Sequence, residues 1–218
     1  NTKSDYLLLL TNDVVLDKGF LKYLESALAK DKKLGAAGGM VFFYDQPKVI
    51  QKVYAKIDHE RLTLKNIGKG EVDKGQYSKN KIVEALTFTG ILLRREVFNK
   101  IGFFDERFFH TYEDLDFLLR MQKAGYKMVF VPKARFWHKG SRSLGGESPQ
   151  GTYYFTRNDL LIKKKYGKLS LIDHFRAFKF MFSSFLLTPF MAEKRDHYRA
   201  IALAISDFYQ GRFGRRDL

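Results

Sequence analysis

The sequence predicts an α/β fold, in which a sheet with flanking helices is followed by a helical C-terminal extension. Residues 6–10 form an uninterrupted apolar run, as in a central strand covered on both faces. A helical stripe follows at Phe20, Leu21, Leu24 and Leu28. Later strand and helix patterns alternate until residue 138, and only helical patterns continue beyond it. We therefore predict a catalytic-type domain over 1–151 and a helical extension over 152–218.

Each further element is predicted from its local pattern. Asp17 is the expected N-cap of a helix ending at Ala29, and Gly38-Gly39 predict a turn into a strand. Residues 45–82 are polar with weak periodicity, as in a long excursion of short strands and loops. Pro132 is expected to stop the last strand. The other expected elements are a strand over 85–93, helices over 94–100 and 114–124, a strand beginning at 127, and helices over 152–166 and 170–210.

Composition limits the chemistry that the chain can perform. The 218 residues suffice for one domain with a sizeable core, and 45% of them are hydrophobic. The absence of cysteine excludes disulfides, thiolate metal sites and cysteine nucleophiles. The net charge of +15 indicates an anionic partner: nucleic acid, acidic lipid or a phosphorylated substrate.

Two acidic clusters and one histidine carry most of the functional information. Thr11-Asn12-Asp13 directly follows the apolar strand, and the run Glu113-Asp114-Leu115-Asp116 opens a helical pattern. His138 ends the strand-like run from Lys127 to Trp137. Oxygen and imidazole ligands at strand ends can converge on one divalent cation, and a spare carboxylate beside such a site can act as a base. These residues indicate a metal-assisted group transferase.

In this order, the motifs resemble those of inverting nucleotide-sugar glycosyltransferases of family 2 with a GT-A fold, and of its rhamnosyltransferase-like members. Leu10-Thr11-Asn12-Asp13 looks like their metal-binding DxD motif, and Thr89-Gly90 looks like their acceptor-side strand. Glu113–Asp116 is similar to their catalytic acidic motif, and Phe136-Trp137-His138 to their late strand with a histidine ligand. The resemblance continues to about residue 166 through Tyr153, Arg157 and Asn158.

The resemblance assigns a role to each candidate residue. It implies that Asp13 and His138 bind Mg²⁺ or Mn²⁺, although Thr11 stands where many relatives carry a carboxylate. It makes Asp114 the general base and Glu113 the group that orients the acceptor hydroxyl. Beside these roles, the residues that we predict to bind substrate are Gly90, Asp116, Trp137 and Arg142.

Ordinary structural roles also account for some of these residues. An Asx residue such as Asp13 is common in a strand-to-helix turn, and Thr111-Tyr112-Glu113-Asp114 fits a helix capping box. Gly90 suits a strand bulge, and Trp137 suits the core. A capping box explains one acid, whereas three acids lie within four positions.

The implied reaction moves a sugar from a nucleoside-diphosphate-sugar to a hydroxyl of a glycan or lipid-linked acceptor, with inversion. The resemblance also implies that a nucleotide-binding part precedes Asn1, so we expect this fragment alone to be inactive. Two rival functions remain at this stage: a basic nucleic-acid-binding module, although no nucleic-acid motif is recognised, and a catalytically silent scaffold.

The C-terminal helical segment suggests where such an enzyme works. Residues 175–191 are rich in aromatic side chains, are interrupted only by Arg176 and Lys179, and are followed by the basic residues Lys194, Arg195 and Arg199. This combination is typical of a helix lying on an anionic membrane surface, and it equally suits a helix packed on the domain or on a second copy in a homo-oligomer. The expected location is the cytoplasm, at the inner face of the membrane.

Overall fold

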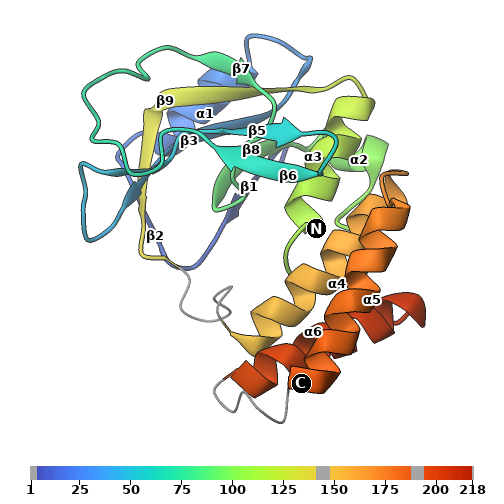
Figure 1. Cartoon of the computed structure of the whole chain (residues 1–218). Helices are drawn as coiled ribbons and strands as arrows, with labels where there is room; N and C mark the ends of the chain where they lie inside the picture. Colours follow the sequence, from blue (N-terminus) through green and yellow to red (C-terminus); the bar gives the residue numbers. More distant parts are fainter. Residues whose placement is uncertain (1–3, 141–147, 188–193, 218) are drawn as a thin grey trace. The chain divides into compact units, whose positions relative to one another are not determined.

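A computed structural model describes residues 4–140, 148–187 and 194–217 (Figure 1). The chain forms two compact units, which are described separately. Unit 1 contains the sheet and comprises residues 1–59, 63–103 and 117–140. Unit 2 contains the C-terminal helices and comprises residues 60–62, 104–116 and 141–218. The boundary predicted at residue 151 falls inside a helix that begins at Pro149.

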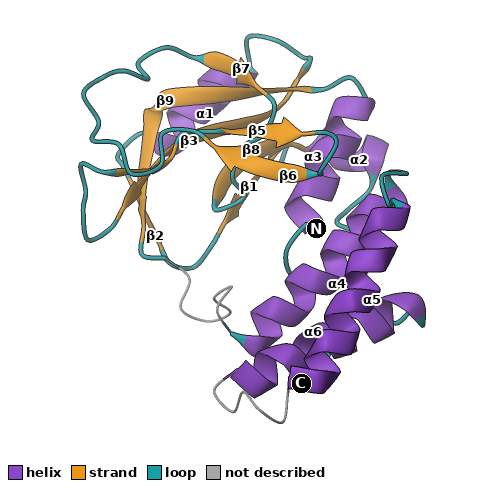
Figure 2. Ribbon diagram, in the orientation of Figure 1, coloured by secondary structure: helices purple, strands orange, loops and turns teal. Residues whose placement is uncertain are grey.

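In the described part of unit 1, the main sheet has seven strands (Figure 2). Its two long strands, β3 (Leu34–Phe43) and β9 (Lys127–His138), lie side by side and parallel. Each carries two shorter antiparallel strands along its outer edge. On β3 these are β8 (Gly90–Arg94) and β4 (Ile50–Lys52); on β9 they are β7 (Lys81–Val83) and β2 (Val14–Leu16). Strand β1 (Tyr6–Leu10) completes the sheet beyond β8.

Two sequence predictions fail where β3 meets β9. The expected turn at Gly38-Gly39 is wrong, because β3 continues through both glycines, and the expected stop at Pro132 is wrong, because β9 continues to His138. The pairing register shifts between Gly38 and Met40, and a bulge of this kind accommodates a proline that cannot donate a ladder hydrogen bond. A Cβ on Gly39 would lie 2.0 Å from the carbonyl oxygen of Ala134, so only glycine allows this close approach.

Helix α1 (Phe20–Leu28) covers one face of the sheet in unit 1. Its buried residues Phe20, Leu24 and Leu28 join a core with residues of β3 and β9, and Phe20 meets Phe136 edge-to-face at 5.3 Å. The helix begins later than predicted. The assignment of Asp17 as N-cap is wrong, because Gly19 takes that position in a left-handed conformation and the Asp17 carbonyl accepts the amide of Phe20.

The opposite face is covered by α2 (Arg95–Ile101) and by the part of α3 (Glu113–Lys123) that belongs to unit 1. A Cβ on Gly35 of β3 would touch Val97 of α2 and Met121 of α3, both at 2.9 Å. The predicted excursion over 45–82 contains β4, a two-stranded ribbon and the start of β7. The ribbon pairs β5 (Ala55–Asp58) with β6 (Thr63–Asn66).

The described part of unit 2 is built on α4 (Pro149–Lys165), α5 (Leu171–Leu187) and α6 (Arg195–Tyr209), with α6 packed on both of the others (Figure 1). Ser148 caps α4 by accepting the amide of Gly151 at 3.0 Å. The core of the unit contains Tyr153, Tyr154, Ala200 and Ala204. The segment 104–116, which includes the predicted catalytic acids, belongs to this helical unit.

Candidate active site

The structure brings Asp13 and His138 together in unit 1. Asp13 directly precedes β2, whose first residue, Val14, pairs with His138 at the end of β9. The carbonyl of Asp13 also accepts the amide of Lys139 at 3.0 Å. As a result, Oδ2 of Asp13 lies 3.1 Å from Nε2 of His138. Antiparallel pairing of β2 with β9 therefore places two predicted ligands side by side.

The surroundings of this pair fit a divalent cation. Two ligand atoms at right angles around a cation with bonds of about 2.1 Å lie about 3.0 Å apart, close to the observed separation. Oδ1 of Asp13 is buried and has no hydrogen-bond partner among the described residues. Hydrogen bonding by the Thr11 side chain, and to a lesser degree the charge of His138, hold the pKa of Asp13 below its usual value, against the effect of burial. The carboxylate is thus charged and partly unsatisfied.

Gln51, which the sequence did not predict, orients the imidazole. Nδ1 of His138 lies 2.7 Å from Oε1 of Gln51. Donation from Nδ1–H to this oxygen leaves the lone pair of Nε2 for a ligand, as in most histidine metal sites. Within the described ranges, no group of three or more His, Cys, Asp or Glu side chains converges, so Asp13 and His138 would need oxygens from substrate or water to complete a shell.

Gly90 and Trp137 both have packing roles in unit 1. Gly90 is buried, and a Cβ there would lie 2.9 Å from the ring of Phe136, so the core itself requires glycine at this position. Trp137 stacks on Phe42 at 6.0 Å and donates its indole N–H to the carbonyl of Pro47 at 3.2 Å. Their contact with a sugar stays a prediction.

The predicted catalytic acids Glu113 and Asp114 begin α3, in unit 2. The loop before them is strained: Phe109, Thr111 and Tyr112 have positive φ angles of 55°, 63° and 69°. Side chains rarely adopt this conformation, and each such residue costs on the order of 1–2 kcal/mol. Three of them together persist only where surrounding contacts hold the loop.

Arg157 and Asn158, adjacent residues of α4, make those contacts. The buried Asn158 donates from Nδ2 to the carbonyls of Phe108 at 2.7 Å, His110 at 2.7 Å and Thr111 at 3.0 Å. The buried Arg157 donates to the carbonyls of Arg107 and Phe108 at 3.0 and 3.3 Å. The two residues fix the backbone of the loop that positions Glu113 and Asp114 at the start of α3.

Replacement of Asn158 by alanine should therefore lower both stability and turnover. The change removes the three hydrogen bonds that Asn158 donates to loop carbonyls, of which only that of Phe108 keeps a second side-chain donor among the described residues, Arg157. Each lost hydrogen bond typically costs about 1 kcal/mol. We expect a lower melting temperature and a kcat reduced at least tenfold. Thr152→Ala on the same helix removes a single hydrogen bond, to His197, and serves as the control. Equal effects of the two variants on kcat would contradict a positioning role for Asn158.

Glu113 lies in an apolar environment that changes its protonation. Burial, and then the negative charge of Asp114, raise the pKa of Glu113 from 4.5 to about 7. Its Oε2 atom is buried and accepts no hydrogen bond from the described part of the chain. A carboxyl group with a pKa close to neutral is well suited to exchange protons with a substrate hydroxyl.

The same shift predicts a pH-dependent stability. Because the folded-state pKa exceeds the unfolded one, the native state holds the proton more tightly, and stability falls as pH rises from about 4.5 to about 7. Glu113→Gln stays neutral, so relative to the natural chain it should gain on the order of 1–3 kcal/mol between pH 4 and pH 8. Urea unfolding at both pH values measures the gain. The exposed Glu106→Gln is the control, and a gain no larger than the control's would contradict the burial argument.

Asp116 has a different environment from the other two acids. It is fully buried, and its Oδ1 lies 2.6 Å from Nζ of Lys165 and accepts the hydroxyl of Tyr166 at 2.9 Å. These contacts tie the start of α3 to the end of α4, within unit 2. Its predicted binding of substrate stays a prediction. Arg142, the remaining predicted substrate residue, lies outside the described residues.

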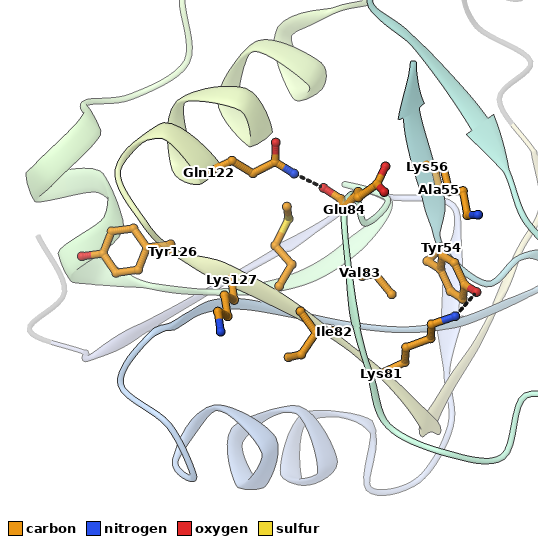
Figure 3. Close-up of a pocket in the computed structure, with 11 residues that line it drawn as sticks. Tyr54, Ala55, Lys56, Lys81, Ile82, Val83, Glu84, Gln122, Tyr126 and Lys127 are labelled. Carbon is orange, nitrogen blue, oxygen red and sulfur yellow. Dashed lines mark hydrogen bonds between the residues drawn. The ribbon is translucent and has the colours of Figure 1, made fainter. Parts of the chain in front are cut away.

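A cavity of about 270 Å³ in unit 1 contains none of the predicted site residues (Figure 3). Lys127 and Met128 in its wall lie at the opposite end of β9 from His138. Lys81 donates to the hydroxyl of Tyr54 at 3.0 Å across one side, and Gln122 donates to the carbonyl of Glu84 at 2.8 Å across the other. The predicted chemistry is therefore not located in this cavity.

Comparison with known proteins agrees with the family resemblance predicted from the motifs. Residues 1–152 match the family described as glycosyltransferase like family 2. The chain is 24% identical to rhamnosyltransferase WbbL of Escherichia coli over 187 residues, which cover 78% of this chain and 69% of that protein. It is 44% identical to the N-acetylglucosaminyl-diphospho-decaprenol L-rhamnosyltransferase of Mycobacterium tuberculosis over 55 residues, which cover 25% of this chain and only 18% of that enzyme.

Among solved structures, GalNAc-T7 in complex with UDP, GalNAc and Mn²⁺ matches with a TM-score of 0.49 and 16% identity, covering 79% of this chain and 37% of that one. The family match extends over most of the chain, from the strand before Asp13 to the start of α4. It confirms the resemblance predicted from the motifs. The chain belongs to glycosyltransferase family 2.

Proposed function

We propose that the protein transfers a rhamnosyl group, with inversion, from a nucleoside-diphosphate-sugar to a hydroxyl of a lipid-linked acceptor. The rhamnosyltransferase relatives support the sugar, and the name of the mycobacterial relative supports a lipid-linked acceptor. The structural observation that carries the proposal is the contact of Asp13 with His138, which the sequence predicted from residues far apart in the chain.

Asp13 and His138 would hold Mg²⁺ or Mn²⁺ against the donor diphosphate. When bound, the cation offsets the charge that grows on the leaving diphosphate. The chain's own contribution is to keep Asp13 ionised, with the Thr11 side chain beside it, and to hold the imidazole through Gln51. This arrangement supports a metal site that has threonine at position 11.

Asp114 would act as the general base. It accepts the proton of the acceptor hydroxyl while that oxygen forms a bond to the anomeric carbon and the bond from this carbon to the diphosphate breaks. Attack opposite the leaving group inverts the anomeric centre. Glu113, whose pKa is about 7, would hold the acceptor hydroxyl beside Asp114.

Sugar transfer by the full-length protein tests the proposal. The protein is incubated with nucleoside-diphospho-rhamnose, Mn²⁺ and a prenyl-diphospho-N-acetylglucosamine acceptor, and the anomeric configuration of the product is read by NMR. We expect one rhamnosyl residue per acceptor, with a configuration opposite to that of the donor. Retention of configuration would reject the single-displacement mechanism, and transfer of a different sugar would reject the rhamnosyl assignment.

The outer face of α5 supports attachment to a membrane surface. Leu171, Phe175, Phe178 and Phe182 recur at helical spacing and are exposed, Leu171 to 87% and Phe175 to 69%. No helix in the described ranges is long and apolar enough to cross a bilayer. Large exposed apolar side chains beside Arg176 and Lys179 are typical of a helix lying in the interface of an anionic membrane.

Flotation with vesicles tests this attachment. We expect the chain to float with vesicles containing acidic lipid and to float less at high salt, because salt screens the charge contribution. The double variant Phe175→Ser, Phe178→Ser should reduce flotation at least tenfold, since both side chains are exposed and their loss leaves the core intact. Flotation that is unaffected by this variant would assign the outer face to a protein partner.

A further inference from the structure

Unit 2 contains an apolar groove to which no role has been assigned. The cavity measures about 290 Å³ and lies between α4, α5 and α6, which pack side by side (Figure 1). Its size is close to the lower limit of small-molecule sites, roughly 300–1,000 Å³. Its apolar lining consists of Phe155, Leu160, Ala177, Phe180, Ile201 and Ile205.

The groove and the exposed outer face lie on different sides of α5. Successive residues of an α-helix are separated by about 100° around its axis. Ala177 and Phe180 therefore lie on the groove side, whereas Phe175 and Phe178 point nearly the opposite way. Substitutions can therefore alter the groove and the outer face separately.

One wall of the groove contacts the residue next to the predicted catalytic acids. The ring centroids of Phe155 and Tyr112 lie 5.6 Å apart. The hydroxyl of Tyr112 donates to Oδ1 of Asp159, another residue of the groove, at 3.1 Å. Tyr112 directly precedes Glu113, so the groove adjoins the point at which the acceptor hydroxyl would be deprotonated.

The charges in the groove leave one cation available. Lys163 is held by Asp159 at 2.7 Å and by Asp173 at 3.1 Å, so its charge is already compensated. Arg176 also lines the groove and has no ion-pair or hydrogen-bond partner among the residues that the structure describes. An apolar groove with one guanidinium that no described residue compensates matches a ligand with an apolar chain and an anionic head group.

We propose that this groove binds the first isoprene units of a prenyl-diphosphate-linked acceptor, with Arg176 facing the diphosphate. The inference rests on the proposed function, because it concerns the lipid part of the same acceptor. Such an acceptor places its sugar hydroxyl at the acids and its chain beyond the diphosphate. The contact of Phe155 and Asp159 with Tyr112 provides this continuity within one unit.

Calorimetric titration of the chain with farnesyl diphosphate, below its aggregation concentration, tests the groove without any sugar transfer. We expect farnesyl diphosphate to bind at least tenfold more tightly than inorganic diphosphate. Thr156→Trp should weaken the binding at least tenfold by filling the groove, since Thr156 lines it and is only partly buried. Phe180→Ser, which opens one wall, should weaken it as well, while Phe178→Ser on the outer face should leave it unchanged.

The outcomes separate this inference from the proposed function. Equal binding of farnesyl and inorganic diphosphate, or equal effects of Phe180→Ser and Phe178→Ser, would reject the groove even if sugar transfer occurs. If Thr156→Trp does not fold, the two phenylalanine variants decide. A dimer that Phe180→Ser dissociates, without farnesyl binding, would reassign the groove to a second copy. Farnesyl binding without rhamnosyl transfer would reject only the proposed function.

Discussion

Asp114→Asn is expected to abolish most sugar transfer while leaving the fold intact. Asparagine has the shape of aspartate and can still accept a hydrogen bond at a helix start, but it cannot take the proton of the acceptor hydroxyl. General base catalysis typically contributes about 10²–10⁴-fold, so kcat of the full-length protein should fall by that factor. The acceptor KM should change little.

Two control measurements show whether a lower kcat of Asp114→Asn reflects the loss of the general base. The melting temperature of the variant should match that of the natural protein, because Asp114 is only partly buried. Glu113→Gln should raise the acceptor KM more than it lowers kcat if Glu113 orients the acceptor. A decrease in kcat below tenfold for Asp114→Asn, with a large decrease for Glu113→Gln, would transfer the base role to Glu113, whose pKa of about 7 suits that role.

Asp13→Ala is expected to remove the binding of Mn²⁺ in the presence of a nucleoside diphosphate. The change deletes one of the two proposed ligands and leaves the contact of His138 with Gln51. We expect Mn²⁺ affinity, measured by electron paramagnetic resonance, to fall at least tenfold, and sugar transfer to fall at least a hundredfold. Chelation of the metal should have the same effect on the natural protein, and added Mn²⁺ should reverse it.

Gln51→Leu provides a graded comparison for the same site. It keeps both proposed ligands but removes the hydrogen bond that orients the imidazole, and the loss of such a partner typically costs about 10–100-fold in metal affinity. Asp17→Ala, outside the pair, is the control. If Asp13→Ala lowers the melting temperature but leaves Mn²⁺ binding unchanged, the contact of Asp13 with His138 is an ion pair that stabilises the fold.

Much of the fold could be predicted from local patterns. The apolar run over residues 6–10 is a strand, and the acids from Glu113 to Asp116 open a helix, because both elements follow from side-chain periodicity and helix-start preferences. The order of the motifs also sufficed to predict the family. These features depend on residues close together in the sequence.

The sequence could not predict features that depend on pairing between distant segments. Strand β9 continues through Pro132 because the register shift opposite Gly38 and Met40 removes the need for a backbone N–H donor at that position. Gln51 reaches His138 from a segment with weak periodicity, so no local signal marked it.

By itself, the sequence determined the family, the candidate residues and the types of most elements, because these are written in short motifs and in the periodicity of apolar side chains. Only the tertiary structure decided the environment of each candidate. Antiparallel pairing of β2 with β9 brings Asp13 to His138, while Asp116 is buried against Lys165 and Oε2 of Glu113 accepts no hydrogen bond from the described residues. Ligand geometry, burial and pKa arise from contacts between distant segments, and the folded chain alone defines them.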